Sequence, residues 1–458
     1  MSRPALGRCE VLATSLDEAG AGVGAAEGRE LHVADLLPGE RAEVAIDHAS
    51  PHHPTAWAQI VRRLGPTSAD RVAPACPAFG RCGGCVWQHL AYPAQLIAKR
   101  ERVVRGLGDA IAPDRVAPAV AAPATLGYRN KGKYVAGRGP TGLVLGAYAP
   151  RSHRVIDTLG CQIVAPIIDE VASWVRGAAE RARLIAYDEP SRDGELRYVV
   201  IREAAGDVLV VLVVSSKTSR SKLEAVANAL ARHTAVHGLV AIVNDRRDGA
   251  IVPSGSSAQV LIGHGHLVEH VAGVAIEVGA SEFVQVNRGQ AHAMYARVAA
   301  LALEHAPPGA RAIDLFAGLG GIGLHLARAG ARVTAVEIDR DAVAQLRRAA
   351  ERSELALTAV AADTSKPTDE LRDAIGRAPD VVVVNPPRKG LAPATRALLA
   401  ELAAPTIVYV SCGPESLGRD LAELATAGWR ADVIEPFDLM PGTAQVETIV
   451  RLRRSEHA

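Results

Sequence analysis

The sequence predicts an α/β protein in which a small β-barrel and an α+β region precede a doubly wound parallel sheet. Three observations support this prediction. Apolar strands and amphipathic helices alternate strictly from about residue 311, the pattern of a parallel sheet with helices on both faces. Short strands with glycine-rich connectors fill residues 9–64, and an apolar hairpin occupies residues 196–214.

The composition is typical of a globular protein with a large core. The 458 residues are 48% hydrophobic and 22% charged, which excludes a disordered, collagenous or disulfide-dense chain. No apolar run reaches the roughly 18 residues of a membrane-spanning helix, and the first residues are too polar for a signal peptide. We expect a cytoplasmic monomer that contacts no membrane.

The net charge of +1 conceals a basic segment. Residues 1–64 hold 6 Lys/Arg against 9 Asp/Glu, whereas residues 65–160 hold 13 against 5, a local excess of +8. Concentrated positive charge favours a surface that meets phosphate, although a solvated basic surface would explain the count equally well.

The first 66 residues predict a small barrel. Its short strands are expected at residues 9–14, 30–33, 43–46 and 56–61, with glycines and a Leu-Pro-Gly turn between them. A stretch rich in proline, glycine and cysteine follows at residues 65–95, and a short basic helix is expected at residues 94–106.

The middle of the chain predicts an α+β domain with an antiparallel sheet. Strands 196–202 and 208–214 flank Gly206-Asp207, which is typical of a hairpin. Helices are expected at residues 167–184 and 221–233, the second with apolar residues at helical spacing.

The last part of the chain predicts the doubly wound sheet. Strands are expected at residues 312–316, 333–337, 357–361, 381–384 and 407–410. Helices are expected at residues 289–305, 322–329, 340–352, 367–377, 394–403 and 416–427. The final strands, 431–435 and 446–452, have no helix between them, so the sheet should end in an antiparallel hairpin. The predicted domains are 1–66, 67–270 and 271–458.

A glycine-rich loop follows the first strand of the alternating part. Gly318 to Gly323 read GxGxxG, and Glu337 ends the next strand, where a carboxylate can bind a ribose diol. Asp363, at the end of the third strand, is placed to meet an adenine ring. NAD enzymes, flavoenzymes and S-adenosylmethionine (SAM) methyltransferases share this pattern, and a glycine-rich packing turn would produce it too.

The fourth strand ends in Asn385-Pro-Pro-Arg388. Two successive prolines fix a rigid, extended exit that lacks backbone donors. Asn/Asp-Pro-Pro here is similar to the active-site corner of methyltransferases that act on nucleobases, and a nicotinamide enzyme has no use for it. Amino-group methyltransferases usually place an aromatic residue next, so Arg388 disfavours adenine-N6 chemistry.

Cys412 stands where the fifth strand gives way to a helix, a position that favours a thiolate. An inert core cysteine is the ordinary interpretation of a lone cysteine in a strand. Uracil chemistry gives this one a use, because C5 of uracil attacks a methyl group only after a thiolate has added to C6. The proton then left on C5 needs a base, for which Glu447 is the candidate.

Together these motifs resemble the RNA uracil-C5 methyltransferases. The whole chain resembles their iron–sulfur branch, the bacterial 23S ribosomal RNA enzymes of RumA type. The resemblance rests on five motifs: Phe283-Val-Gln-Val-Asn, Asp314-Leu-Phe-Ala-Gly, Asn385-Pro-Pro-Arg-Lys-Gly, Ser411-Cys-Gly-Pro and Val446-Glu-Thr. It implies a class I SAM-methyltransferase fold with a Rossmann-like sheet, and an OB-like TRAM barrel that binds RNA in the first 66 residues.

The resemblance also implies roles for single residues. Cys412 is the nucleophile and Glu447 the general base by this resemblance. The implied SAM-binding residues are Gln285, Phe316, Gly321, Glu337, Asp363 and Asn385. At Gly321 only the backbone could contribute.

Three positions depart from the family pattern. Asn385 stands where the family usually has Asp, Gly413 where it has Asn, and Gln445 where it has His. These departures leave open a homologue that is inactive or acts on another substrate.

Cys76, Cys82 and Cys85 cluster in the sequence, and the distant Cys161 makes a fourth thiol. Spacing alone fits Zn²⁺ and a [4Fe–4S] cluster equally. The resemblance implies a [4Fe–4S] cluster, since the family's Cys-x5-Cys-Gly-Gly-Cys holds one. The spacing is not the CxxxCxxC of radical-SAM enzymes, so the cluster is expected to be structural.

The run from Tyr128 to Tyr134 mixes aromatic and basic residues, a composition suited to base stacking and phosphate contact. An ordinary exposed strand is the alternative. The expected RNA contacts are Tyr128, Arg129, Lys131 and Lys133. The reacting uridine must be single-stranded or flipped out to reach Cys412.

The sequence therefore predicts SAM-dependent formation of 5-methyluridine in RNA, with 23S rRNA as the expected substrate and tRNA as an alternative. A cytosine-C5 enzyme is a near alternative, but its Pro-Cys corner after the fourth strand is absent. A non-catalytic RNA-binding protein and, more distantly, an NAD-dependent redox protein are the alternatives from other classes.

Overall fold

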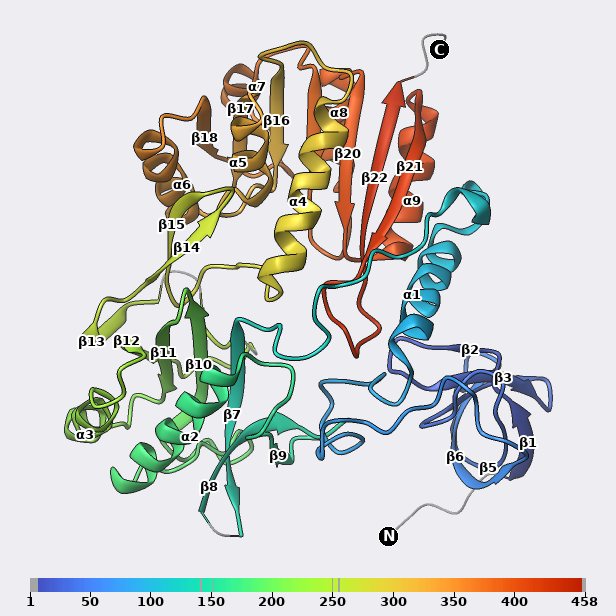
Figure 1. Cartoon of the computed structure of the whole chain (residues 1–458), viewed down its shortest axis with the longest axis vertical. Helices are drawn as coiled ribbons and strands as arrows, with labels where there is room; N and C mark the ends of the chain where they lie inside the picture. Colours follow the sequence, from blue (N-terminus) through green and yellow to red (C-terminus); the bar gives the residue numbers. More distant parts are fainter. Residues whose placement is uncertain (1–6, 141, 151, 249, 254–255, 455–458) are drawn as a thin grey trace.

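The computed structural model describes residues 7–140, 142–150, 152–248, 250–253 and 256–454. Three sheets follow one another along the chain, and a two-stranded hairpin precedes the last of them (Figure 1). None of the helices among these residues has the length and apolar character needed to cross a membrane.

The N-terminal sheet has six strands in the order β1-β5-β6-β4-β3-β2. They are β1 (Arg8–Leu12), β2 (Ser15–Leu16), β3 (Gly22–Ala26), β4 (Arg29–Val33), β5 (Arg41–Ala49) and β6 (Thr55–Leu64). The sheet curls so that β3 approaches β1. The approach is close, since a Cβ atom added at Gly24 of β3 would lie 2.2 Å from the carbonyl oxygen of Leu12 in β1. Two of these strands, β2 and β3, were not expected from the sequence.

The segment after this sheet leads into helix α1 (Tyr92–Leu107) and two short turns, η1 (Gly108–Ala110) and η2 (Pro113–Arg115). Helix α1 packs against the C-terminal sheet, since Val103 and Leu107 share a core with Leu417 of α9 (Pro414–Thr426). The expected basic helix is therefore present and joins two distant parts of the chain.

The central sheet has seven strands in the order β13-β12-β11-β10-β7-β8-β9. They are β7 (Lys131–Gly139), β8 (Gly142–Tyr148), β9 (Val155–Asp157), β10 (Leu196–Ala204), β11 (Asp207–Val214), β12 (Val236–Val243) and β13 (Ala258–Gly263). Helices α2 (Pro166–Arg181) and α3 (Arg220–Leu230) cover one face, and β10 and β11 form the expected hairpin.

The expectation of a purely antiparallel central sheet is wrong in one place. Strands β11 and β12 pair in parallel, with Val210 opposite Leu239. Helix α3 connects them, and parallel neighbours need such a crossover. The sheet is therefore mixed.

The hairpin of β14 (Leu267–Val271) and β15 (Val274–Val278) was not expected from the sequence. Val274 and Ile276 are buried in the core of the C-terminal sheet, whereas Leu267 belongs to a core of the central sheet. The hairpin thus contacts both sheets.

The C-terminal sheet has the order β18-β17-β16-β19-β20-β22-β21. Its strands are β16 (Arg311–Leu315), β17 (Arg332–Glu337), β18 (Leu357–Ala361), β19 (Val381–Val384), β20 (Thr406–Ser411), β21 (Trp429–Phe437) and β22 (Glu447–Arg454). The helices are α4 (Arg288–Leu303), α5 (Gly321–Arg328), α6 (Arg340–Arg352), α7 (Asp369–Ile375), α8 (Pro393–Leu402) and α9.

This arrangement confirms the predicted alternation of strands and helices and the final hairpin. Strands β16 to β20 are parallel, and β22 runs antiparallel between β20 and β21. Helices α4 to α6 pack on one face, and α7 to α9 with α1 pack on the other. In Figure 1 the carboxyl ends of β16 and β20 point to the middle of the molecule, where α1 and the β21–β22 loop lie.

Candidate active site

Cys412 and Glu447 lie next to each other at the carboxyl end of β20. Ser411 pairs with Thr448 in the antiparallel register of β20 and β22, so the residues that flank this pair, Cys412 and Glu447, lie at the same edge. Glu447 is buried and Cys412 is half-buried. The two predicted reacting groups are therefore brought together by one strand pairing.

Arg388 places its positive charge beside both groups. Burial and the negative charge of Glu447 raise the pKa of the Cys412 thiol, and the Arg388 charge opposes this shift. Burial raises the pKa of Glu447 to about 7, again opposed by Arg388. The guanidinium thus favours the ionised forms of both Cys412 and Glu447.

Two loops meet around Cys412, and Gly413 allows them to do so. The Ser416 hydroxyl lies 2.9 Å from both the Arg388 and the Gly413 carbonyl oxygens. A side chain at Gly413 would lie 2.9 Å from that hydroxyl and 3.0 Å from the Arg388 carbonyl. The departure of Gly413 from the family pattern therefore matches the close contact of these loops.

Asp420 holds the corner after β19 and was not singled out from the sequence. Its buried carboxylate accepts from the Leu391 amide at 2.7 Å, from the Tyr409 hydroxyl at 2.8 Å and from Arg396 at 3.0 Å. Because Tyr409 belongs to β20, Asp420 ties the segment that follows Asn385 to the strand that leads to Cys412.

The glycine-rich loop between β16 and α5 turns sharply. Phe316, Gly318 and Gly320 all have left-handed backbone angles, with φ of 65°, 54° and 84°. The Gly318 amide donates to the Glu337 carboxylate at 2.8 Å, and the other oxygen of Glu337 accepts the Ile338 amide at 2.7 Å. Glu337 thus closes this loop against the end of β17.

Tyr295 of α4 fills the space beside Gly321, and no motif in the sequence indicates this contact. A Cβ at Gly321 would lie 2.7 Å from the Tyr295 ring. Burial raises the pKa of Tyr295, and the charges of Glu447 and then Asp314 raise it further. Tyr295 therefore contacts the glycine-rich loop and lies near Glu447. The packing of α4 against α5 brings Tyr295 to this position.

The remaining predicted cofactor residues lie along the same edge. Asp363 follows β18 and accepts from the Ser365 amide at 2.9 Å and its hydroxyl at 2.6 Å, which lowers the Asp363 pKa. The backbone amide of Asn385 donates to the Leu315 carbonyl at 3.3 Å. Gln285 is buried and lies just before α4. The structure thus brings all six predicted residues to one end of the sheet.

The four predicted metal-binding cysteines line one cavity of about 400 Å³. Burial raises the pKa of Cys82, and the nearby Cys161 and Cys76 raise it further. Within the described part of the chain, no three His, Cys, Asp or Glu side chains are arranged to hold a metal ion. Cys161, distant in sequence, is nevertheless brought to the other three.

Three residues of the predicted RNA-binding run line the same cavity, namely Arg129, Lys131 and Lys133. Burial, followed by the charge of Arg202, lowers the pKa of Lys131 to about 7. Among the ion pairs between described residues, none involves these three side chains.

Tyr128, by contrast, lies in the interior, with a relative exposure of 8%. Its hydroxyl donates to the carbonyl of Pro441 at 3.1 Å. The ring therefore supports the β21–β22 loop from the interior, and the predicted RNA contact of Tyr128 remains a prediction.

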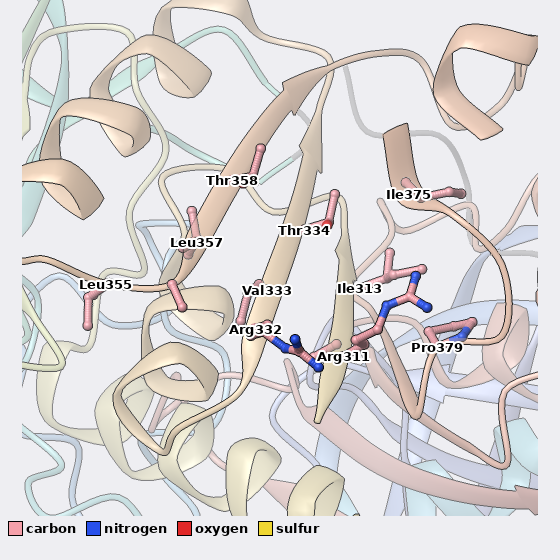
Figure 2. Close-up of a pocket in the computed structure, with 12 residues that line it drawn as sticks. Arg311, Ile313, Arg332, Val333, Thr334, Leu355, Leu357, Thr358, Ile375 and Pro379 are labelled. Atoms are coloured by element: carbon pink, nitrogen blue, oxygen red, sulfur yellow. The ribbon is translucent and has the colours of Figure 1, made fainter. Parts of the chain in front are cut away.

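A second cavity, of about 420 Å³, lies at the opposite end of the C-terminal sheet. Figure 2 shows its lining at the amino ends of β16, β17 and β18, including Arg311, Arg332 and Thr334. Its lining contains no cysteine, histidine or carboxylate. The chemistry of Cys412 and Glu447 therefore belongs to the other edge.

The chain is similar to known RNA methyltransferases along nearly its whole length. The family model described as tRNA (Uracil-5-)-methyltransferase matches residues 275–455. An uncharacterized RNA methyltransferase of Halalkalibacterium halodurans is 31% identical over 97% of this chain and 96% of that protein. One from Thermosynechococcus vestitus is 33% identical over 97% of this chain and 98% of that protein.

A solved structure shares the fold. The tRNA (uracil-54, C5)-methyltransferase of Pyrococcus abyssi, solved in complex with S-adenosyl-L-homocysteine, superposes with a TM-score of 0.75. The match covers 97% of this chain and 100% of that one, at 22% identity, so it establishes the α/β methyltransferase fold. The two relatives and the family model lead to one conclusion: the chain is a methyltransferase and belongs to the same family as these RNA methyltransferases, and its residues 275–455 match the uracil-5-methyltransferase model.

Proposed function

We propose that this enzyme methylates C5 of uridine in RNA, with SAM as the methyl donor. The strongest support is that Cys412 and Glu447 lie next to each other and that the positive charge of Arg388 acts on both. A thiolate and a base that reach one pyrimidine edge are what C5 methylation requires.

The reaction proceeds through a covalent adduct. The Cys412 thiolate adds to C6, and the electrons of the C5–C6 double bond move into an enolate. C5 of the enolate then accepts the methyl group of SAM, and S-adenosylhomocysteine is the other product. The Glu447 carboxylate removes the C5 proton, the double bond forms again, and the thiolate leaves C6. The uridine must be unpaired or flipped out for this edge to reach Cys412.

The cofactor would be held by the residues gathered along the carboxyl edge. Glu337 would accept from the ribose, and Asp363 would meet the adenine, as their strand-end positions suggest. Gln285, Phe316 and Asn385 would line the remainder, and Gly321 would contribute backbone beside Tyr295. When bound, SAM supplies the methyl group as an electrophile.

We propose that Cys76, Cys82, Cys85 and Cys161 hold a structural [4Fe–4S] cluster. Four thiols line one cavity, and three basic side chains without ion-pair partners among the described residues line it as well. A thiolate-bound cluster is negatively charged and would balance them. Anaerobic reconstitution should give four irons and four sulfides per chain, and Cys85→Ser should lose them; zinc bound instead would reject the cluster.

RNA would bind across the same region of the molecule. Lys133, with Arg129 and Lys131 behind it, would contact phosphate. Phe283 is 73% exposed two residues before Gln285 and would stack on a base near the reacting uridine. The N-terminal sheet would act as the TRAM-like RNA-binding part of a three-domain, monomeric, cytoplasmic enzyme.

The proposed substrate is 23S rRNA. A tRNA is the second candidate, favoured by the names of the matching family model and of the Pyrococcus abyssi protein. Methyl transfer from labelled SAM to 23S rRNA and to tRNA transcripts, followed by nucleoside analysis, tests both. We expect label in 5-methyluridine, lost in Cys412→Ala; label in another nucleoside would refute the proposed chemistry.

A further inference from the structure

The loop between β21 and β22, residues 438–446, delivers Glu447 to the active site and carries Gln445. Figure 1 shows this loop extending from the C-terminal sheet alongside α1. Its own strands hold only its two ends. Contacts from distant parts of the chain must therefore fix the position of the loop between them.

A buried ion pair joins α1 to the start of this loop. Lys99 and Asp438 both have 0% exposure, and the Lys99 ammonium donates to the Asp438 carboxylate. Lys99 also donates to the Met440 carbonyl at 3.1 Å, and Asp438 accepts the Met440 amide at 2.9 Å. One turn of the loop is thus closed around a single buried charge pair.

Further contacts from the same segment continue along the loop. Gln95 accepts the Gly442 amide at 2.8 Å, and the Trp87 amide donates to the Gly442 carbonyl at 2.9 Å. Arg102 donates to the Ala444 carbonyl at 2.6 Å. Every second residue from Asp438 to Ala444 is therefore held by residues 87–102.

A buried ion pair is a costly way to fill space, because apolar residues of similar size pack there without a desolvation cost. The pair differs from apolar packing in that its hydrogen bonds are directional. The ammonium and the carboxylate therefore fix the orientation of the turn. Phe437, which directly precedes Asp438, pairs with Glu447 in the strand register, and Gln445 directly follows the anchored Ala444. A displacement of the turn therefore acts on Glu447 through both ends of the loop. A misplacement of about 1 Å can cost on the order of a hundredfold in rate.

We propose that Lys99 and Asp438 are positioning residues that hold Glu447 against C5 of the uridine bound to Cys412. This rests on the proposed function. Cys412 lies on a different loop, so thiolate addition and methyl transfer continue without the pair. Removal of the C5 proton then becomes the slow step, and the methylated adduct on Cys412 accumulates.

The test is the double variant Lys99→Met/Asp438→Asn, which removes both charges, preserves side-chain size and keeps an acceptor for the Met440 amide. The control is Lys222→Met/Glu195→Gln, because Lys222 and Glu195 form a partly buried ion pair at 2.7 Å in the central part of the chain. We expect turnover to fall by about tenfold or more in the first variant and to change little in the control.

Three other readouts separate positioning from general loss of structure. SDS-resistant protein–RNA adduct should accumulate with ordinary RNA, while affinity for SAM stays unchanged. Amide exchange should rise over residues 438–446. Wild-type turnover, or joint loss of SAM binding and adduct, would overturn the positioning role. If wild-type enzyme itself forms no adduct on 5-fluorouridine RNA, the proposed function fails, whereas the exchange result still decides whether the pair anchors the loop.

Discussion

Arg388 and Gln445 join the two loops that flank Cys412. The guanidinium of Arg388 donates to the side-chain oxygen of Gln445 across 2.7 Å. Gln445 stands where the family pattern has His, and here it gives Arg388 an acceptor while the arginine faces Cys412 and Glu447. This departure therefore keeps a role in orienting the charge at the active site.

Replacing Arg388 by Met should slow the attack of Cys412. Loss of the positive charge raises the pKa of the Cys412 thiol. A rise of one in this pKa lowers the fraction of thiolate at neutral pH about tenfold. The rate of adduct formation on 5-fluorouridine RNA, measured from pH 6.5 to 9.5, checks this. The deficit should shrink as the pH rises; a deficit that is the same at every pH would mean that Arg388 acts only through packing.

Glu447 should impose a pH dependence on the last step. Its pKa of about 7 leaves the carboxyl protonated below neutrality, and a protonated carboxyl cannot take the C5 proton. We expect the decay of a preformed methylated adduct after a pH jump to slow about tenfold per unit below pH 7. Glu447→Gln should trap the adduct at every pH, and normal decay in that variant would assign the base to another group.

Gly321→Ala should weaken binding of SAM. The added methyl group would lie 2.7 Å from the Tyr295 ring, so the glycine-rich loop or α4 must shift. Overpacking of this kind costs about 1–3 kcal/mol, and calorimetric titration measures it as a lower affinity. Gly177→Ala, where the methyl meets only a flexible Arg181 side chain at 3.3 Å, is the control. Adding Tyr295→Leu should restore part of the affinity.

Lys133→Met should weaken RNA binding without altering affinity for SAM. If Lys133 contacts one phosphate, the slope of log K against log salt concentration should fall by about one. Arg138→Met, an exposed residue on the same strand that does not line the cysteine cavity, should leave the slope unchanged. Equal effects of both variants would assign the binding to diffuse charge.

Much of the C-terminal sheet could be predicted because its signals are local. Apolar strands and amphipathic helices alternate from Arg311 onward, and Cys412 and Glu447 fall at strand ends that the sheet order makes adjacent. The glycine-rich loop and the Pro-Pro corner likewise mark themselves within a few residues.

The supporting structure could not be predicted, because it depends on long-range contacts. Lys99 meets Asp438 across 339 residues, and Tyr295 meets Gly321 between two helices. The interior position of Tyr128 follows from the Pro441 carbonyl, which nothing near Tyr128 indicates. The strands β14 and β15 interrupt their apolar residues with Glu269, His270 and Glu277, so no apolar run marks them in the sequence.

Covalent capture on Cys412 tests the central claim most directly. The enzyme, prepared anaerobically, would be incubated with SAM and 5-fluorouridine-substituted RNA, and the crosslinked peptide mapped by mass spectrometry. Because fluorine at C5 cannot leave as a proton, the account predicts a stable methylated adduct on Cys412, absent in Cys412→Ala. Methyl transfer to ordinary RNA with no such adduct, or an adduct on another residue, would contradict it.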